Sequence, residues 1–212
     1  MSDMILFHGS RGGIKGDILP ISRMRCDFGK GFYMGTNPDQ AKTLVANDPD
    51  PLFYKLSFDI DSITEERVFR LKDMDWAYFV LYNRGKLDSI KGTSLYKWCE
   101  QAAADKDVII GPIADDAMNE AMNRFMEGDI TDKAFLESIR GLDYGIQYVA
   151  KTAEACRYIQ ILEEKRLFGQ ELVRAVDLSA QRRREGSSVA DAMRKKYRRE
   201  GKYLDELLSE MS

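Results

Sequence analysis

The chain has 212 residues, of which 44% are hydrophobic and 32% are charged, so it can bury the core of one domain, with or without a small appendage. Its formal net charge of −3 gives no overall attraction to nucleic acid or to anionic membranes. No apolar run approaches the roughly 20 residues that a membrane helix needs, and the start lacks a signal-peptide pattern. We therefore expect no membrane partner.

The cysteines and the histidine narrow the chemistry further. Three widely spaced cysteines fit neither a disulfide framework nor a zinc site, which favours a reducing, cytoplasmic environment. The single histidine, His8, excludes chemistry that needs two histidines, including most zinc hydrolases. We expect no metal site.

In chain order, a strand is predicted at residues 4–7 and is followed by a glycine-rich loop. A second glycine-rich stretch, residues 27–35, leads to Asn37 and Pro38. Asn37 as N-cap and Pro38 at the first helical position predict a helix that runs to about Ala46. The rest of the first third is predicted to form strands at residues 53–58 and 67–71.

The middle of the chain has a helical repeat around Trp76 and again around Trp98. The following elements are predicted as a strand at 107–112, helices at 115–126 and 132–139, a strand at 146–150, a short helix from Thr152 and a strand at 157–162. Strands and helices that mix without a regular strand–helix–strand repeat indicate an α+β fold.

Residues 166–212 are predicted to be a helical appendage to a domain of residues 1–165. Ser187 or Ser188 is expected to cap its second helix, which would present an apolar face of Val189, Met193, Tyr197 and Leu204. Its basic runs are typical of a solvated tail or oligomerisation arm. An arm that contacts a partner or RNA stays open as an alternative.

Three segments carry candidate chemistry. They are Phe7-His8-Gly9-Ser10 at the end of the first strand, the loop and strand from Gly29 to Tyr33, and Gln147 within an apolar strand. Each alone is weak, because a lone histidine, a glycine pair or one polar strand residue usually has a structural role.

Taken together, the segments resemble the ADP-ribosyltransferases of the diphtheria-toxin and poly-ADP-ribose-polymerase branch. That branch has a histidine in an HG(S/T) strand, a tyrosine in a GKG(I/F)Y strand and a late glutamate, in whose place this chain has Gln147. More closely, the chain resembles an uncharacterised bacterial family of small proteins with DFGKGFY, IGP-ADD and Q-x-x-x-K-T segments. Members are often encoded beside a small partner protein, as toxins are beside antitoxins. The resemblance covers roughly residues 4–165 and implies a split antiparallel β-sheet with flanking helices.

The resemblance also implies an NAD+ site. His8 and Ser10 would bind a ribose hydroxyl, and Gly9 would let the backbone approach the nicotinamide carboxamide. Tyr33 would stack on the nicotinamide ring, and its neighbour Phe32 would point into the core. Lys30, Arg11 or Arg25 could meet the pyrophosphate, and Gly31 is a further NAD+-binding residue that the resemblance implies.

The implied catalytic residues are His8, Tyr33 and Gln147. Gln147 can accept a hydrogen bond from a ribose hydroxyl, but it can neither stabilise a cation by charge nor take a proton. Three alternatives follow: a neighbouring carboxylate (Asp143 or Glu154) compensates, the acceptor is already a good nucleophile, or the site turns over little. The pair Asp115-Asp116 is interpreted as a helix cap rather than a metal site.

The implied function is an NAD+-dependent ADP-ribosyltransferase that acts as the toxin of a toxin–antitoxin or phage-defence pair. A small helical antitoxin would cover its cleft, and the macromolecular acceptor is a protein or a nucleic acid. A catalytically weak NAD+-binding or partner-binding module and an NAD+ glycohydrolase are the alternatives.

Overall fold

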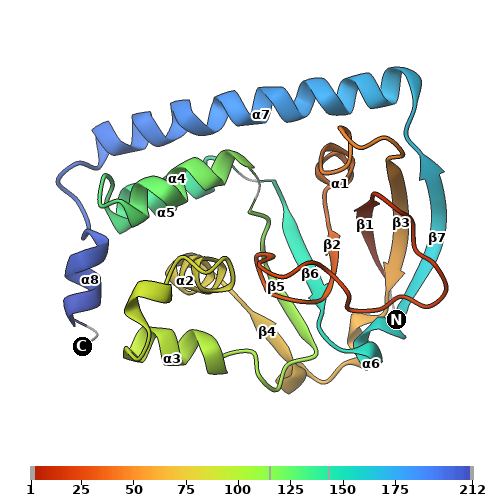
Figure 1. The fold of residues 1–212 in the computed structure, drawn as a ribbon, viewed down its shortest axis with the longest axis horizontal. Coiled ribbons are helices and arrows are strands. Elements are labelled where there is room, and N and C mark those ends of the chain that lie inside the picture. The colour runs from red at the N-terminus through yellow and green to blue at the C-terminus, as the bar shows by residue number, and fades with distance from the viewer. Residues whose placement is uncertain (1–2, 115, 143, 211–212) are drawn as a thin grey trace.

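A computed structural model describes residues 3–114, 116–142 and 144–210 of the chain (Figure 1). The strands are β1 (Met4–Ser10), β2 (Phe32–Gly35), β3 (Leu52–Phe58), β4 (Val68–Arg70), β5 (Val108–Pro112), β6 (Ile146–Ala150) and β7 (Ile159–Arg166). The α-helices are α1 (Pro38–Thr43), α2 (Asp73–Asn83), α3 (Ser94–Gln101), α4 (Asp116–Met126), α5 (Asp132–Arg140), α6 (Ala153–Cys156), α7 (Gly169–Lys196) and α8 (Leu204–Glu210). The α+β class predicted from the sequence is confirmed.

The strands form one seven-stranded sheet in the order β4-β5-β6-β2-β1-β3-β7. The β4–β5 pair is parallel and the other pairs are antiparallel. The prediction of an antiparallel sheet is therefore wrong at this edge. The parallel pairing follows from the connection between the two strands, which crosses over through α2 and α3 and returns the chain in the same direction.

The sheet narrows sharply between β1 and β2. These strands share one register pair, Phe7 with Gly35, whereas β1 pairs with β3 along its full length from Met4 to Ser10. The sheet thus consists of two parts, β4-β5-β6-β2 and β1-β3-β7, that meet at a single point. Backbone groups and side chains beside that point are not covered by a neighbouring strand.

The start of α1 follows the local sequence. The Asn37 side chain accepts hydrogen bonds from the backbone N–H groups of Asp39 (3.0 Å) and Gln40 (3.3 Å), and Pro38 occupies the first turn. This cap was predicted and is confirmed. The helix ends at Thr43, earlier than the expected Ala46, and the chain continues in turns.

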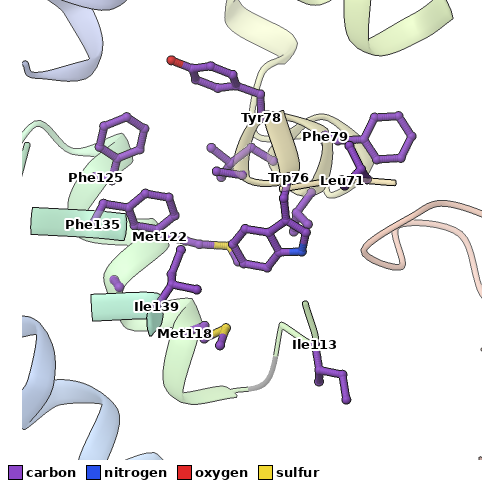
Figure 2. Packing of buried hydrophobic residues seen from close by; sticks show 14 of the residues in the cluster. Leu71, Trp76, Tyr78, Phe79, Ile113, Met118, Met122, Phe125, Phe135 and Ile139 are labelled. Atoms are coloured by element: carbon purple, nitrogen blue, oxygen red, sulfur yellow. The ribbon is translucent and has the colours of Figure 1, made fainter. Parts of the chain in front are cut away.

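Most of the core lies among α2, α4, α5 and the β4-β5-β6-β2 part of the sheet. Figure 2 shows the Phe125 and Phe135 rings side by side, with Met122 extending toward Trp76. The two phenylalanine rings stack with centroids 4.9 Å apart, and the Trp76 indole N–H donates to the Pro112 carbonyl at 2.9 Å. This packing fixes the end of β5, which borders the candidate site.

Two strands are longer than predicted. β1 continues to Ser10 because β3 pairs with it throughout, and β7 continues to Arg166 because it pairs with β3 as far as Leu52. The short helix α6 begins as predicted after Thr152, whose hydroxyl accepts from the Ala155 N–H at 3.2 Å.

The segment after β7 is helical, as predicted, but Ser187 and Ser188 do not cap a second helix. They lie exposed in the interior of α7, which runs without a break from Gly169 to Lys196. The helix packs on α1, α4 and α5 (Figure 1), and its buried residues are Ala175, Arg182, Gly186 and Ala190. Tertiary packing therefore overrides the weak local preference of glycine and serine to end a helix. No helix in the described ranges is both long and apolar enough to cross a membrane.

Substitutions at the two serines test the continuity of α7. Ser188→Pro should lower the free energy of unfolding by about 3 kcal/mol, since proline removes a hydrogen bond and clashes within a helix. Ser187→Ala should be neutral or stabilising by up to about 0.5 kcal/mol. Urea unfolding measures both. A helix that began at these serines would give the reverse pattern: proline tolerated in the first turn, and a loss of about 1 kcal/mol for the alanine at the cap.

Candidate functional site

The three segments singled out in the sequence lie on neighbouring strands. Phe7 of β1 pairs with Gly35 of β2, and Gly35 in turn pairs with Gln147 of β6. A cavity of about 1050 Å³ opens at this junction, and its walls include His8, Tyr33 and Gln147. We call it the junction cavity. Residues that are far apart in the chain therefore border one space because β6, β2 and β1 are adjacent in the sheet.

Two of the predicted binding glycines are explained by packing of the protein itself. A Cβ at Gly9 would collide with the Ala41 carbonyl of α1, and a Cβ at Gly31 would collide with the Val149 side chain and lie 2.9 Å from the Ala150 carbonyl. The sequence predicted a close approach between the Gly9 backbone and the nicotinamide. In the structure, the close neighbours of Gly9 and Gly31 are other parts of the protein. Gly9 and Gly31 both line the junction cavity.

His8 links the two parts of the sheet. Its Nδ1 lies 2.7 Å from the Tyr33 carbonyl, so Nδ1 carries the proton and donates it, and Nε2 is left as an acceptor. Burial lowers the pKa of His8 below its ordinary value of 6.5, although the hydrogen bond to Tyr33 opposes this. The ring packs at 4.6 Å from the Phe32 ring, on the Phe32 side of β2. His8 is therefore a neutral hydrogen-bond acceptor at the cavity wall near pH 7.

Tyr33 lies on the other side of β2 and closes the DFGKG turn. Its hydroxyl donates to the Gly29 carbonyl at 2.6 Å and accepts from the Phe28 N–H at 2.9 Å. Lys151, the residue after β6, donates to the Phe28 carbonyl at 2.8 Å and holds the same turn. Burial raises the pKa of Tyr33, so its hydroxyl stays protonated. Phe32 packs in the core, as predicted.

Gln147 is almost fully buried, with 6% of its surface exposed. Its side-chain nitrogen donates to the Pro112 carbonyl at 3.1 Å, and Gln147 also hydrogen-bonds the Asp27 side chain. The amide nitrogen donates to Pro112 and to Asp27. The side-chain carbonyl oxygen of Gln147 is therefore the atom that can accept a hydrogen bond from a ligand.

Asp27 is a carboxylate at the cavity that was not predicted from the sequence. It lies in the DFGKGFY segment and lines the junction cavity beside Gln147. Arg84 donates to one Asp27 oxygen from two nitrogens, at 2.8 and 2.6 Å. Burial raises the pKa of the Asp27 carboxyl, and the Arg84 charge and the hydrogen bonds from Arg84 and Gln147 oppose this rise. Asp27 was within the quoted motif, but no local pattern indicated that it would meet Gln147.

The carboxylates that the sequence suggested as substitutes for the missing glutamate are not found beside Gln147 among the described residues. Glu154 is exposed on α6, pairs with Arg157 at 2.9 Å and is absent from the cavity wall. Asp143 and Asp115 lie outside the described residues, and of Asp116 only its place at the start of α4 is described. The described residues contain no group of three or more histidine, cysteine, aspartate or glutamate side chains that could hold a metal ion.

Of the three basic residues predicted to bind the pyrophosphate, two line the cavity and one does not. Arg11 and Arg25 line the junction cavity with Ser10, and Arg11 pairs with Asp48 at 3.0 Å. Lys30 is exposed and does not line it. The structure therefore brings His8, Gly9, Ser10, Gly31, Tyr33 and Gln147 to one cavity and leaves Lys30 outside.

The chain belongs to a family described as proteins of unknown function (DUF3990), whose profile matches residues 4–161. This match covers the sheet except the end of β7, and it excludes α7 and α8. No curated protein and no solved structure matches the chain.

The protonation of His8 can be tested directly because it is the only histidine. The unfolded chain takes up the proton near pH 6.5, whereas folded His8 resists it to lower pH. Stability from this group is therefore complete above pH 6.5 and is lost as the pH falls from 6.5 toward the folded pKa. The slope is at most about 1.4 kcal/mol per pH unit.

NMR titration of the single imidazole should give a midpoint below 6.5, and unfolding free energies should show this slope in the wild type but not in His8→Gln. A midpoint at or above 6.5 would contradict the buried, neutral assignment.

Proposed function

We propose that the chain binds NAD+ in the junction cavity and transfers its ADP-ribose unit to a macromolecular acceptor. The observation that carries this proposal is the meeting of the HGS, GKGFY and late-glutamine segments at one cavity on β1, β2 and β6. These are the segments whose resemblance to ADP-ribosyltransferases suggested NAD+ chemistry. A cavity of about 1050 Å³ is large enough for a dinucleotide, since ligand sites commonly measure roughly 300–1,000 Å³.

The wall groups suit the parts of NAD+. The Nε2 acceptor of His8 can bind a ribose hydroxyl, which donates to it without a change in protonation. The Tyr33 ring is held in place by its two hydroxyl hydrogen bonds, so it offers a fixed aromatic surface to the flat nicotinamide. Fixed groups of this kind reduce the entropy lost on binding.

Asp27 supplies the negative charge that Gln147 lacks. In the transfer, the bond between ribose C1′ and the nicotinamide nitrogen breaks, and nicotinamide leaves with the electron pair. The acceptor then bonds to C1′ and gives up a proton. The Asp27 carboxylate would stabilise the cationic ribose and accept that proton, while the Gln147 carbonyl would accept a hydrogen bond from a ribose hydroxyl. A raised pKa suits a proton acceptor because it strengthens the base.

We also propose that the chain acts as a toxin restrained by a small helical antitoxin over the cavity. This assignment depends on the resemblance to proteins encoded beside a small partner. The residue 11–27 loop and α7 both contribute to the cavity wall, so a protein that covers them would hinder access of NAD+.

A catalytically weak NAD+-binding module is the second candidate, and one observation favours it. Arg84 forms an ion pair with Asp27, which reduces the charge that Asp27 can offer to a cationic ribose. An NAD+ glycohydrolase differs from the transferase only in using water as acceptor.

Nicotinamide release by the purified protein tests the proposal. Release should rise when a bacterial lysate supplies acceptors, and Asp27→Asn should lower it at least about 100-fold through loss of charge stabilisation. His8→Ala should also lower release, mainly through weaker NAD+ binding. Glu154→Gln is the matched control because it removes a carboxylate outside the cavity, and it should leave the rate unchanged.

The outcomes separate the candidates. Release that needs no lysate indicates a glycohydrolase, and saturable NAD+ binding without release indicates the weak module. Absence of both binding and release would rule out the proposal. Growth arrest on expression of the wild type, relieved by Asp27→Asn, is the result that the toxin assignment requires.

A further inference from the structure

Helix α7 contributes a cationic group to the junction cavity. Ser179, Arg182 and Arg183 lie three and four residues apart, so they share one side of the helix, and all three line the cavity. This part of α7 lies beyond residue 161, where the family match ends. The family's shared segments therefore do not form the whole cavity wall.

Arg182 is unusual among the arginines of this wall because it is buried and has no anionic partner among the residues that the structure describes. It is 8% exposed, and among the described residues it forms no ion pair. Its guanidinium lies over the Tyr144 ring at 4.6 Å, and within the described ranges its Nη1 has no hydrogen-bond partner. By comparison, Arg84 pairs with Asp27 and Arg11 pairs with Asp48.

A buried guanidinium with an unused donor is costly, since the desolvated N–H loses its hydrogen bonds to water. The Tyr144 ring compensates in part for the charge but offers nothing to Nη1. An anion in the cavity would supply the missing acceptor, because guanidinium groups bind phosphate with paired, charge-assisted hydrogen bonds.

The charged side chains around the cavity also favour an anionic ligand. Seven basic and three acidic side chains are among its described lining residues, although the whole chain carries −3. The basic ones are Arg11, Lys15, Arg23, Arg25, Arg84, Arg182 and Arg183, and the acidic ones are Asp17, Asp27 and Asp48. A concave wall of one predominant sign concentrates oppositely charged ligands.

We propose that Arg182, with Arg183 beside it, binds a phosphate group of the ligand in the junction cavity. If NAD+ is that ligand, as the proposed function holds, the group is its pyrophosphate. α7 is then part of the binding site, and Arg182 replaces Lys30 in the phosphate-binding role expected from the sequence.

Ligand binding to three arginine variants tests this inference. Titration calorimetry would compare NAD+, ADP and inorganic pyrophosphate with adenosine, which has no phosphate. Arg182→Gln should weaken NAD+ and ADP binding by about 10- to 100-fold, the effect of losing a charge-assisted hydrogen bond, and leave adenosine binding unchanged. Arg184→Gln is the matched control on the same helix, since Arg184 is exposed and does not line the cavity.

Arg182→Lys serves as a second variant, because it keeps the charge and most of the stem if Arg182→Gln loses its fold. It should give an intermediate loss, and melting temperatures without ligand verify that each variant is folded.

NAD+ and ADP affinities within twofold of wild type in folded Arg182→Gln would overturn the inference and leave the proposed function standing. Wild-type binding of ADP and pyrophosphate through Arg182, without binding of NAD+, would instead sustain the inference and contradict the proposed function. Wild-type protein that binds no phosphate-bearing probe would overturn the inference as well.

Discussion

The single pairing of Phe7 with Gly35 is the constraint on which the site depends. Had β1 and β2 paired along their lengths, the backbone at the junction would have been covered, and no cavity could open there. Beside this pair α1 packs closely on Gly9, where any larger residue would meet the Ala41 carbonyl. The hydrogen bond from His8 to the Tyr33 carbonyl then joins the two strands just beside their one register pair.

Burial determines the electrostatics around this junction. His8, Asp27, Tyr33 and Arg182 are each wholly or largely withdrawn from water, and burial favours the neutral forms of the first three. Arg182 cannot become neutral in this way, because a guanidinium does not lose its proton in proteins. The protein thus holds a desolvated set of polar groups around one cavity. Such groups are typical of binding and catalytic sites, where a ligand supplies the missing partners.

Local features were predictable from the sequence, and features that need distant partners were not. Asn37 and Pro38 identified the start of α1 because a cap acts within one turn. The continuity of α7 through Ser187 and Ser188 was missed because it depends on packing against α4 and α5. The sheet edge was predicted as antiparallel because no sequence pattern distinguishes the parallel β4–β5 pair.

The candidate site likewise combines local features that the sequence indicated with features that depend on distant residues. The motif segments lie on the three strands β1, β2 and β6, which border the junction cavity. The roles of single residues within them were harder to assign, since Asp27 acts with Arg84, 57 residues away, and Lys30 points to solvent although it lies in the motif. Arg182 could not have been selected from the run Arg182-Arg183-Arg184, because the helix phase alone decides which of the three is buried.

The most direct test of the central claim, that the junction cavity holds NAD+, uses the one histidine as a reporter. His8 is the only imidazole in the chain and lines the cavity, so its ring resonances report on this site alone. NAD+ should shift them saturably, with the same affinity that calorimetry gives for the whole protein. Imidazole resonances that stay unchanged while NAD+ binds elsewhere, or that show no response at millimolar NAD+, would contradict the account.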